Sequence, residues 1–318
     1  MQGGFQLAFD DLGMDPSKQS AQDYTVSATG VVSRTFSVWI RQISQYIIIF
    51  GIISAVLTVI SFLILFTVFE RIGVLGTDPL SYFVNIFIMT SLPDLTLIAV
   101  SLLFAIVAFI INAILGGAAI KFALDDYNAR RGDIRTSFSH SFRKTFNIIA
   151  VQLVISFFSS VLFLPGFYLL TNAMMSIDIS DPFNPIFPPG SIENMMAGAS
   201  LTLIGGIILL YVSARFAPTL AVVIDTDLSA IGSLKKSWNL TSGKVWHVLG
   251  SWILFGLVVV VLGAIVGAVG YFLQPYNLVI GSIVSTLLFG ALTFIFPVVL
   301  YRDLSSRVKE SSLDELMI

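Results

Sequence analysis

Residues 95–120 read LTLIAVSLLFAIVAFIINAILGGAAI, and residues 121–135, which follow directly, read KFALDDYNARRGDIR. The first stretch carries no charged residue and exceeds the roughly 20 apolar residues that a helix needs to cross the hydrocarbon core of a bilayer. The second stretch gathers four Lys and Arg residues among three Asp residues. An apolar block that ends in a basic connection predicts a membrane-spanning helix whose end faces the cytoplasm.

The whole chain has the composition of a membrane protein. Of its 318 residues, 56% are hydrophobic and only 11% are charged, and the mean hydropathy is +0.92. A soluble domain carries about 25% charged residues. The net charge of −2 provides no basic surface for phosphates, so we expect no nucleic-acid partner. Because there is no Cys, disulfides and thiolate metal sites are excluded.

Apolar blocks long enough to span a bilayer recur along the chain and define its fold class. We predict an all-α polytopic membrane protein with six transmembrane helices. The predicted spans are 46–69, 95–120, 147–171, 200–223, 247–273 and 278–301. Two shorter segments are assigned to the outer side, 82–89 in the interface and 178–189 as an ordered external loop whose four prolines prevent a regular helix.

The basic residues set the predicted orientation. Of the 17 Lys and Arg residues, only Arg71 falls in the connections on the outer side. This positive-inside distribution predicts a multi-pass protein of a prokaryotic plasma membrane with both termini in the cytoplasm. The predicted divisions are a polar tail over 1–29, a membrane domain over 30–303 and a C-terminal tail over 304–318. Residues 1–40 contain no apolar segment with a cleavage site, so we expect no secretory signal peptide.

The spans are arranged in three parallel repeats. Each predicted unit consists of a cytoplasmic amphipathic helix in the interface, a span, an outer loop and a returning span, over residues 30–120, 132–223 and 228–301. The helices are expected to begin near Ser33, Ser137 and Ser233. The alignment places Thr35 to Ser37 against Ser137 to Ser139, and Ser233 against Ser137.

A second stretch carries a family resemblance. Residues 230–250 read AIGSLKKSWNLTSGKVWHVLG and follow Phe216, Pro218 and Asp225. This stretch resembles the signature of the membrane domain of glycerophosphodiester phosphodiesterase-type proteins and of its stand-alone prokaryotic relatives of unknown function. The resemblance extends diffusely from about Gly30 to Asp303 and implies a membrane fold. The family's catalytic domain is a separate soluble barrel, so the resemblance implies no catalytic residue here.

Basic and aromatic residues near the cytoplasmic ends of the spans are the candidates for contact with lipid head groups. Arg215 lies inside the fourth span, where a cation costs roughly 2.5–3.5 kcal/mol at the bilayer centre. We expect its guanidinium to be neutralised by Asp225, a backbone carbonyl or a lipid phosphate. The candidates are Arg41, Lys121, Arg143, Lys144, Arg215, Lys235, Lys236 and Trp238.

No catalytic, metal-binding or cofactor-binding residue is predicted. Asp125, Asp126, Asp225 and Asp227 resemble acidic pairs that could hold Mg²⁺, but basic residues lie nearby and ion pairs are expected instead. Neither of the two histidines has a neighbouring His or Cys. The chain is therefore expected not to be an enzyme.

Two function classes remain. The first is a non-enzymatic membrane protein that organises lipids or serves as an accessory subunit of a membrane complex. The alternative is a transporter or channel for a small or lipid-like substrate, which Arg215 and Pro218 favour because a broken helix frees carbonyls for a ligand.

The expected partners are membrane lipids and other membrane proteins. Gly263 and Gly267 form a GxxxG pair that is expected to pack a helix of the same chain, with self-association as the alternative.

Overall fold

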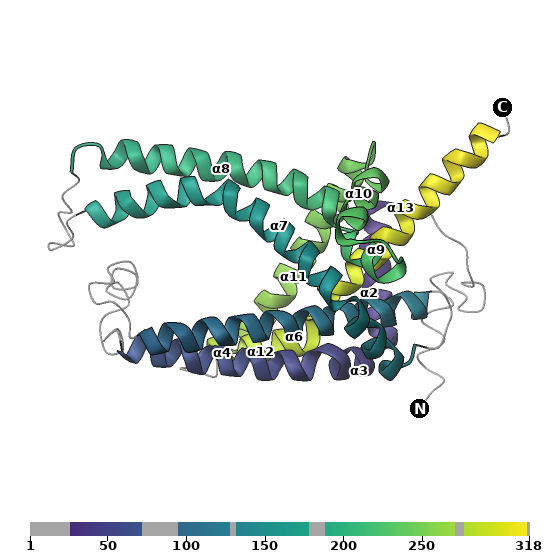
Figure 1. Ribbon diagram of the computed structural model, residues 1–318, viewed down its shortest axis with the longest axis horizontal. Helices are drawn as coiled ribbons and strands as arrows, with labels where there is room; N and C mark the ends of the chain where they lie inside the picture. The colour runs from purple at the N-terminus through teal and green to yellow at the C-terminus, as the bar shows by residue number, and fades with distance from the viewer. Residues whose placement is uncertain (1–25, 72–94, 128–131, 178–187, 271–276, 317–318) are drawn as a thin grey trace.

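The computed structural model describes residues 26–71, 95–127, 132–177, 188–270 and 277–316, and the regular structure in these ranges is helical (Figure 1). Within them, six segments are long and apolar enough to cross a membrane, which confirms the predicted all-α class with six candidate spans. These segments are Ile43–Thr67, Ala99–Tyr127, Ile134–Ser176, Ser191–Asp225, Val245–Val269 and Val279–Val308. The segment predicted at 82–89 and most of that at 178–189 lie outside the described residues.

The helices are described here in the three units that the sequence predicted. The first unit contains α2 (Ala28–Arg41), α3 (Ile43–Tyr46), a π-helical turn η1 (Ile47–Gly51), α4 (Ile52–Arg71) and α6 (Leu95–Tyr127). The second contains α7 (Ile134–Ser176), α8 (Ser191–Phe216) and α9 (Thr219–Asp225). The third contains α10 (Ala230–Leu240), α11 (Val245–Gly270), α12 (Asn277–Phe289) and α13 (Leu292–Leu316). Helix α13 thus includes residues 304–316, which the sequence assigned to a tail.

The short helices α2, α9 and α10 gather at one end of the molecule, which we call the short-helix end (Figure 1). The best-buried apolar residues lie there, among them Ala118 of α6, Val222 of α9 and Leu300 of α13, each fully buried. Along the long helices, by contrast, Phe157 of α7 and Val260 of α11 are 67% and 68% exposed. Exposed apolar faces on long helices suit lipid contact, so the protein core is concentrated at the short-helix end.

Three helices begin with the same kind of cap. The side chains of Ser27, Asp133 and Ser229 accept hydrogen bonds from the backbone N–H three residues on, at 3.1, 3.0 and 3.2 Å. Such a cap satisfies one of the free N–H groups in the first turn. Eight residues beyond each cap lies a hydroxyl side chain with no exposed surface. These residues are Thr35, Ser141 and Ser237.

Counting from the caps corrects the register predicted for the first unit. Ser137 and Ser233 lie four residues after their caps, as the sequence alignment placed them. Thr35, however, corresponds to Ser141 rather than to Ser137, a shift of four residues. Four residues are close to one helical turn, so both alignments place Thr35 on the same face of its helix. The amphipathic pattern of the sequence therefore does not distinguish between them. The threefold repeat itself stays a prediction.

The second unit differs from the first and third because its first helix does not end before the span. Helix α7 runs unbroken for 43 residues, whereas the expected interfacial helix would have ended near residue 146. No Gly or Pro occurs between Ile134 and Leu164 to interrupt it. In the first unit Gln42 leaves the helical conformation, and in the third Gly243 has φ of 72°, a left-handed conformation that glycine adopts easily.

Candidate functional site

Most charged side chains at the short-helix end are held in ion pairs. Each of the four aspartates that resembled metal ligands has a basic partner, and the expectation of local ion pairs is confirmed for Asp125 alone among them. The pairs are Arg41–Asp126 at 2.6 Å, Lys121–Asp125 at 2.7 Å, Lys144–Asp227 at 2.6 Å and Arg302–Asp225 at 3.4 Å. Only Lys121–Asp125 is local in the sequence. In the described ranges no three His, Cys, Asp or Glu side chains are grouped so as to hold a metal ion.

The Lys144–Asp227 pair joins α7 to the segment after α9. Lys144 Nζ also donates to the carbonyl oxygen of Thr226 at 2.8 Å, and the hydrogen bond from Lys144 holds the pKa of Asp227 below its usual range. Asp227 itself is fully exposed. Two of the predicted lipid contacts, Arg41 and Lys144, therefore bind one element to another, whereas Lys121 is paired with Asp125 within α6. Arg143 is exposed and makes no direct hydrogen bond in the described chain.

Arg215 is buried at the end of α8 and is neutralised within the protein. Its side chain donates to the carbonyl oxygen of Trp238 at 3.2 Å and to Thr241 Oγ1 at 3.3 Å. The guanidinium also lies over the Trp238 ring, 4.2 Å from its centroid, which is a cation–π geometry. A backbone carbonyl was one of the three partners expected. Asp225 is not the partner, because it accepts from Tyr301 Oη and Arg302.

The helix break at Pro218 is filled by side chains of the same protein. Helix α8 ends at Phe216, and α9 begins after Pro218, which cannot donate a backbone hydrogen bond. The carbonyl oxygen of Arg215 instead accepts from Ser237 Oγ at 2.9 Å. The break therefore docks α10 onto α8, and this carbonyl is occupied rather than open to a transported substrate.

A buried cluster around Asp303 was not anticipated from the sequence. The carboxylate accepts from the backbone N–H of Val26 at 2.8 Å, from His247 Nε2 at 2.8 Å and from Arg307 Nε at 3.1 Å, and its side chain is 1% exposed. Arg307 also donates to the Val26 carbonyl oxygen. These residues come from the start of α2, from α11 and from α13. His247 and Asp303 are separated by 56 residues, and no spacing rule connects them.

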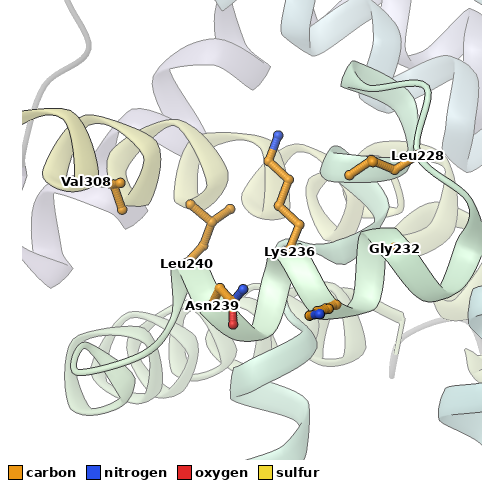
Figure 2. A pocket seen from close by; sticks show the side chains of 7 residues that line it. Leu228, Gly232, Lys236, Asn239, Leu240 and Val308 are labelled. Carbon is orange, nitrogen blue, oxygen red and sulfur yellow. The ribbon is translucent and has the colours of Figure 1, made fainter. Parts of the chain in front are cut away.

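An open groove lies between α10 and α13 at the short-helix end, and two of the side chains that line it are lysines. Its volume is about 410 Å³, and Figure 2 shows the side chains around it. Within the described chain, neither Lys235 nor Lys236 makes a hydrogen bond or an ion pair. Lys236 is half-buried and Lys235 is exposed. The lining residues are Leu228, Gly232, Lys235, Lys236, Asn239, Leu240 and Val308.

Trp238 connects the groove helix to Arg215. It is 37% exposed, and its ring lies 5.7 Å from that of Phe216. The structure thus brings Arg215, Trp238 and the two lysines together around α10. Arg41, Lys121, Arg143 and Lys144 belong to other helices, α2, α6 and α7.

The glycine pair on α11 is not used for packing within the described chain. A Cβ added at Gly263 or Gly267 would meet no described atom within 4 Å. The described helices therefore do not pack closely on this pair, and the expectation that it packs a helix of the same chain stays a prediction. Close helix contacts occur instead at other glycines, such as Gly51, where an added Cβ would lie 2.6 Å from the Leu287 carbonyl oxygen.

The chain was compared with protein-family models, curated proteins and solved structures, and it matches one family model. No curated protein and no solved structure matches the chain. A family model, the membrane domain of glycerophosphoryl diester phosphodiesterase, matches residues 192–305. This region includes Arg215, all of α10 and the His247–Asp303 contact. The resemblance predicted from residues 230–250 is confirmed, since the chain matches that membrane-domain family over residues 192–305.

Proposed function

We propose that the chain is a non-enzymatic integral membrane protein that organises lipids in the cytoplasmic leaflet of a prokaryotic plasma membrane. The observation that carries the proposal is that Lys235 and Lys236, both on α10 at the short-helix end, make no ion pair or hydrogen bond with the described residues. Each basic residue close to an anionic leaflet contributes about 1 kcal/mol of attraction. Lysines that the protein does not pair are available for lipid phosphates.

The proposal orients the short-helix end toward the cytoplasm, with α2, the start of α7 and α10 in the interface as three repeated amphipathic helices. Their matching caps and buried hydroxyl residues support this arrangement. Large apolar side chains project from the same end, including Trp246 at 87%, Phe146 at 82% and Ile231 at 76% exposure. Trp and Phe with neighbouring basic residues are typical of a helix lying at the lipid boundary.

The state of the carboxylates supports a structural rather than a catalytic role. Hydrolysis requires a base or a metal-held water near the reacting bond. Asp225 and Asp303 each accept hydrogen bonds from two or more groups of the protein, and Asp126 is paired with Arg41. These acceptors bind helices to one another.

A second copy of the chain is the proposed protein partner. Gly263 and Gly267 leave open space along α11, and small residues let two helices approach closely in a membrane. Replacing Gly263 with Ile would block that approach. Sedimentation of the protein in lipid nanodiscs should then show fewer dimers than for the wild type.

Lipid binding and turnover can be tested on the same preparation. The full chain is reconstituted into nanodiscs containing a mixture of phosphatidylglycerol and phosphatidylcholine, and the lipids that stay bound after detergent extraction are quantified by mass spectrometry. We expect enrichment of phosphatidylglycerol and no hydrolysis of glycerophosphodiesters with Mg²⁺ or Ca²⁺. Metal-dependent product formation that disappears in Asp225→Asn would refute the non-enzyme proposal. Solute flux across proteoliposomes would favour the transporter alternative.

A further inference from the structure

In each of the first two units, a side chain seven residues after the cap of the first helix forms a contact with the end of that unit's returning segment. Arg34, seven residues after the Ser27 cap, donates to Tyr127 Oη at 2.7 Å at the end of α6. His140, seven residues after the Asp133 cap, contacts the Ile224 carbonyl oxygen at 3.0 Å near the end of α9. Because a carbonyl oxygen only accepts, His140 Nε2 is the donor. In both units a nitrogen donor at this position meets an oxygen acceptor of the protein.

The third unit has the donor, but the described residues offer it no acceptor. Lys236 lies seven residues after the Ser229 cap. In Figure 2 its side chain extends between Leu228 and Leu240, with Val308 of α13 facing Leu240. Among the described residues no Asp or Glu lines the groove, and within the same part of the chain Lys236 makes no hydrogen bond or ion pair. Where the first two units have an oxygen acceptor for this side chain, the third has the open groove.

We propose that the groove between α10 and α13 binds the phosphate of an anionic phospholipid, with Lys236 as its principal ligand. The Lys236 ammonium group has no acceptor in the described chain, and a phosphate oxygen would supply the acceptor that Tyr127 and Ile224 supply in the other units. Lys235 and Asn239 line the same groove and add further N–H donors. None of the described lining residues is a carboxylate that would repel an anion.

The remaining lining explains why the anion belongs to a lipid. Leu228, Leu240 and Val308 form an apolar wall beside the lysines. A glycerol backbone and the first acyl carbons would be removed from water against this wall, whereas inorganic phosphate would leave it exposed. The site deepens the proposed function and depends on it, since the groove must lie at the level of the head groups.

The site can be tested with the full chain in a neutral detergent and short-chain lipids that dissolve as monomers. Dihexanoyl phosphatidylglycerol is titrated against the wild type, Lys236→Gln, Lys236→Arg and the Lys235→Gln/Lys236→Gln double variant. Arg143→Gln is the matched control, because Arg143 is an exposed cation at the same end and outside the groove. Glycerol phosphate and dihexanoyl phosphatidylcholine are titrated in parallel. Size-exclusion chromatography checks that each variant is folded.

We expect Lys236→Gln to raise the Kd about 10-fold and the double variant about 100-fold, while Lys236→Arg stays close to the wild type. Arg143→Gln should change the Kd less than about 2-fold, and glycerol phosphate should bind at least about 10-fold more weakly than the lipid. Equal weakening by Arg143→Gln and Lys236→Gln would overturn the groove site and leave general lipid attraction intact. Equal binding of glycerol phosphate would identify a free-anion site instead. No preference of the wild type for phosphatidylglycerol over phosphatidylcholine would overturn the site and the proposed function together.

Discussion

Removing the Asp303 carboxylate should destabilise the protein more than removing any other acidic group at the short-helix end. Asp303→Ala leaves the Val26 N–H without its 2.8 Å acceptor and leaves Arg307 and His247 without their shared partner. Breaking a buried ion pair by removing one partner costs about 3–5 kcal/mol. We expect the lower end of that range, because the side chains of Arg307 and His247 are 26% and 18% exposed and can partly rehydrate.

Asp303→Asn separates the hydrogen bond from the charge. The amide oxygen can still accept from Val26, so the loss should be about 1–2 kcal/mol, comparable with one hydrogen bond to a charged group. Asp227→Ala is the matched control, because Asp227 is ion-paired at the same end but fully exposed, and no measurable loss is expected.

Denaturant titration in mixed micelles, followed by the fluorescence of the four Trp residues, measures the free energy of unfolding of each variant. The order of destabilisation should be Asp303→Ala, then Asp303→Asn, then Asp227→Ala. Equal losses for Asp303→Ala and Asp227→Ala would refute the view that the Asp303 cluster holds α2, α11 and α13 together.

Three further predictions concern packing, topology and Arg215. Gly51→Ala should lower stability by about 1–3 kcal/mol, because its Cβ would lie 2.6 Å from a backbone carbonyl oxygen of α12, whereas Gly263→Ala should be neutral or slightly stabilising in the same titration. The chain has no Cys, so single cysteines can report its topology in intact cells. Cysteine in place of the exposed Ser242 should be shielded from an impermeant thiol reagent, and cysteine in place of the exposed Pro189 should be labelled. The reverse result would invert the topology. Arg215→Leu should lower the free energy of unfolding by less than about 3 kcal/mol, since only the hydrogen bonds and the ring contact of Arg215 are lost. The same variant should leave solute flux across proteoliposomes unchanged. Loss of a specific flux in a stable variant would contradict the non-transporter proposal.

The long elements of this fold were predictable because lipid imposes strong constraints on sequence. A span needs an uninterrupted apolar block, and such blocks are visible without knowledge of the fold. Helix ends were less predictable. The region around residue 146 shows why: a basic amphipathic start followed by an apolar run suits either two helices or one, and only the absence of a Gly or Pro favours the single helix that α7 forms.

The candidate site was predictable in its residue types but not in its partners. The basic residues near span ends were identified, yet the sequence does not show which of them find a carboxylate. Lys144 and Lys236 look alike in the sequence, but Lys144 meets Asp227 from 83 residues away while Lys236 meets an open groove. Long-range pairs such as His247–Asp303 depend on how the helices pack, and one sequence carries no spacing signal for them.

The contact between Val26 and Asp303 also has a consequence for biosynthesis. The two residues are separated by 277 positions, so at about 5–20 residues per second the ribosome needs roughly 15–55 s to deliver Asp303 after Val26 has emerged. Until α11 and α13 have been synthesised, the buried face of α2, which includes Val31, Thr35 and Val38, lacks its contacts with these two helices. The hydrogen bonds from Arg34 and Arg41 to α6 can form earlier, because α6 is synthesised before α11 and α13. The contact of the α2 end with α13 is therefore a late step of assembly, although Val26 is synthesised long before Asp303.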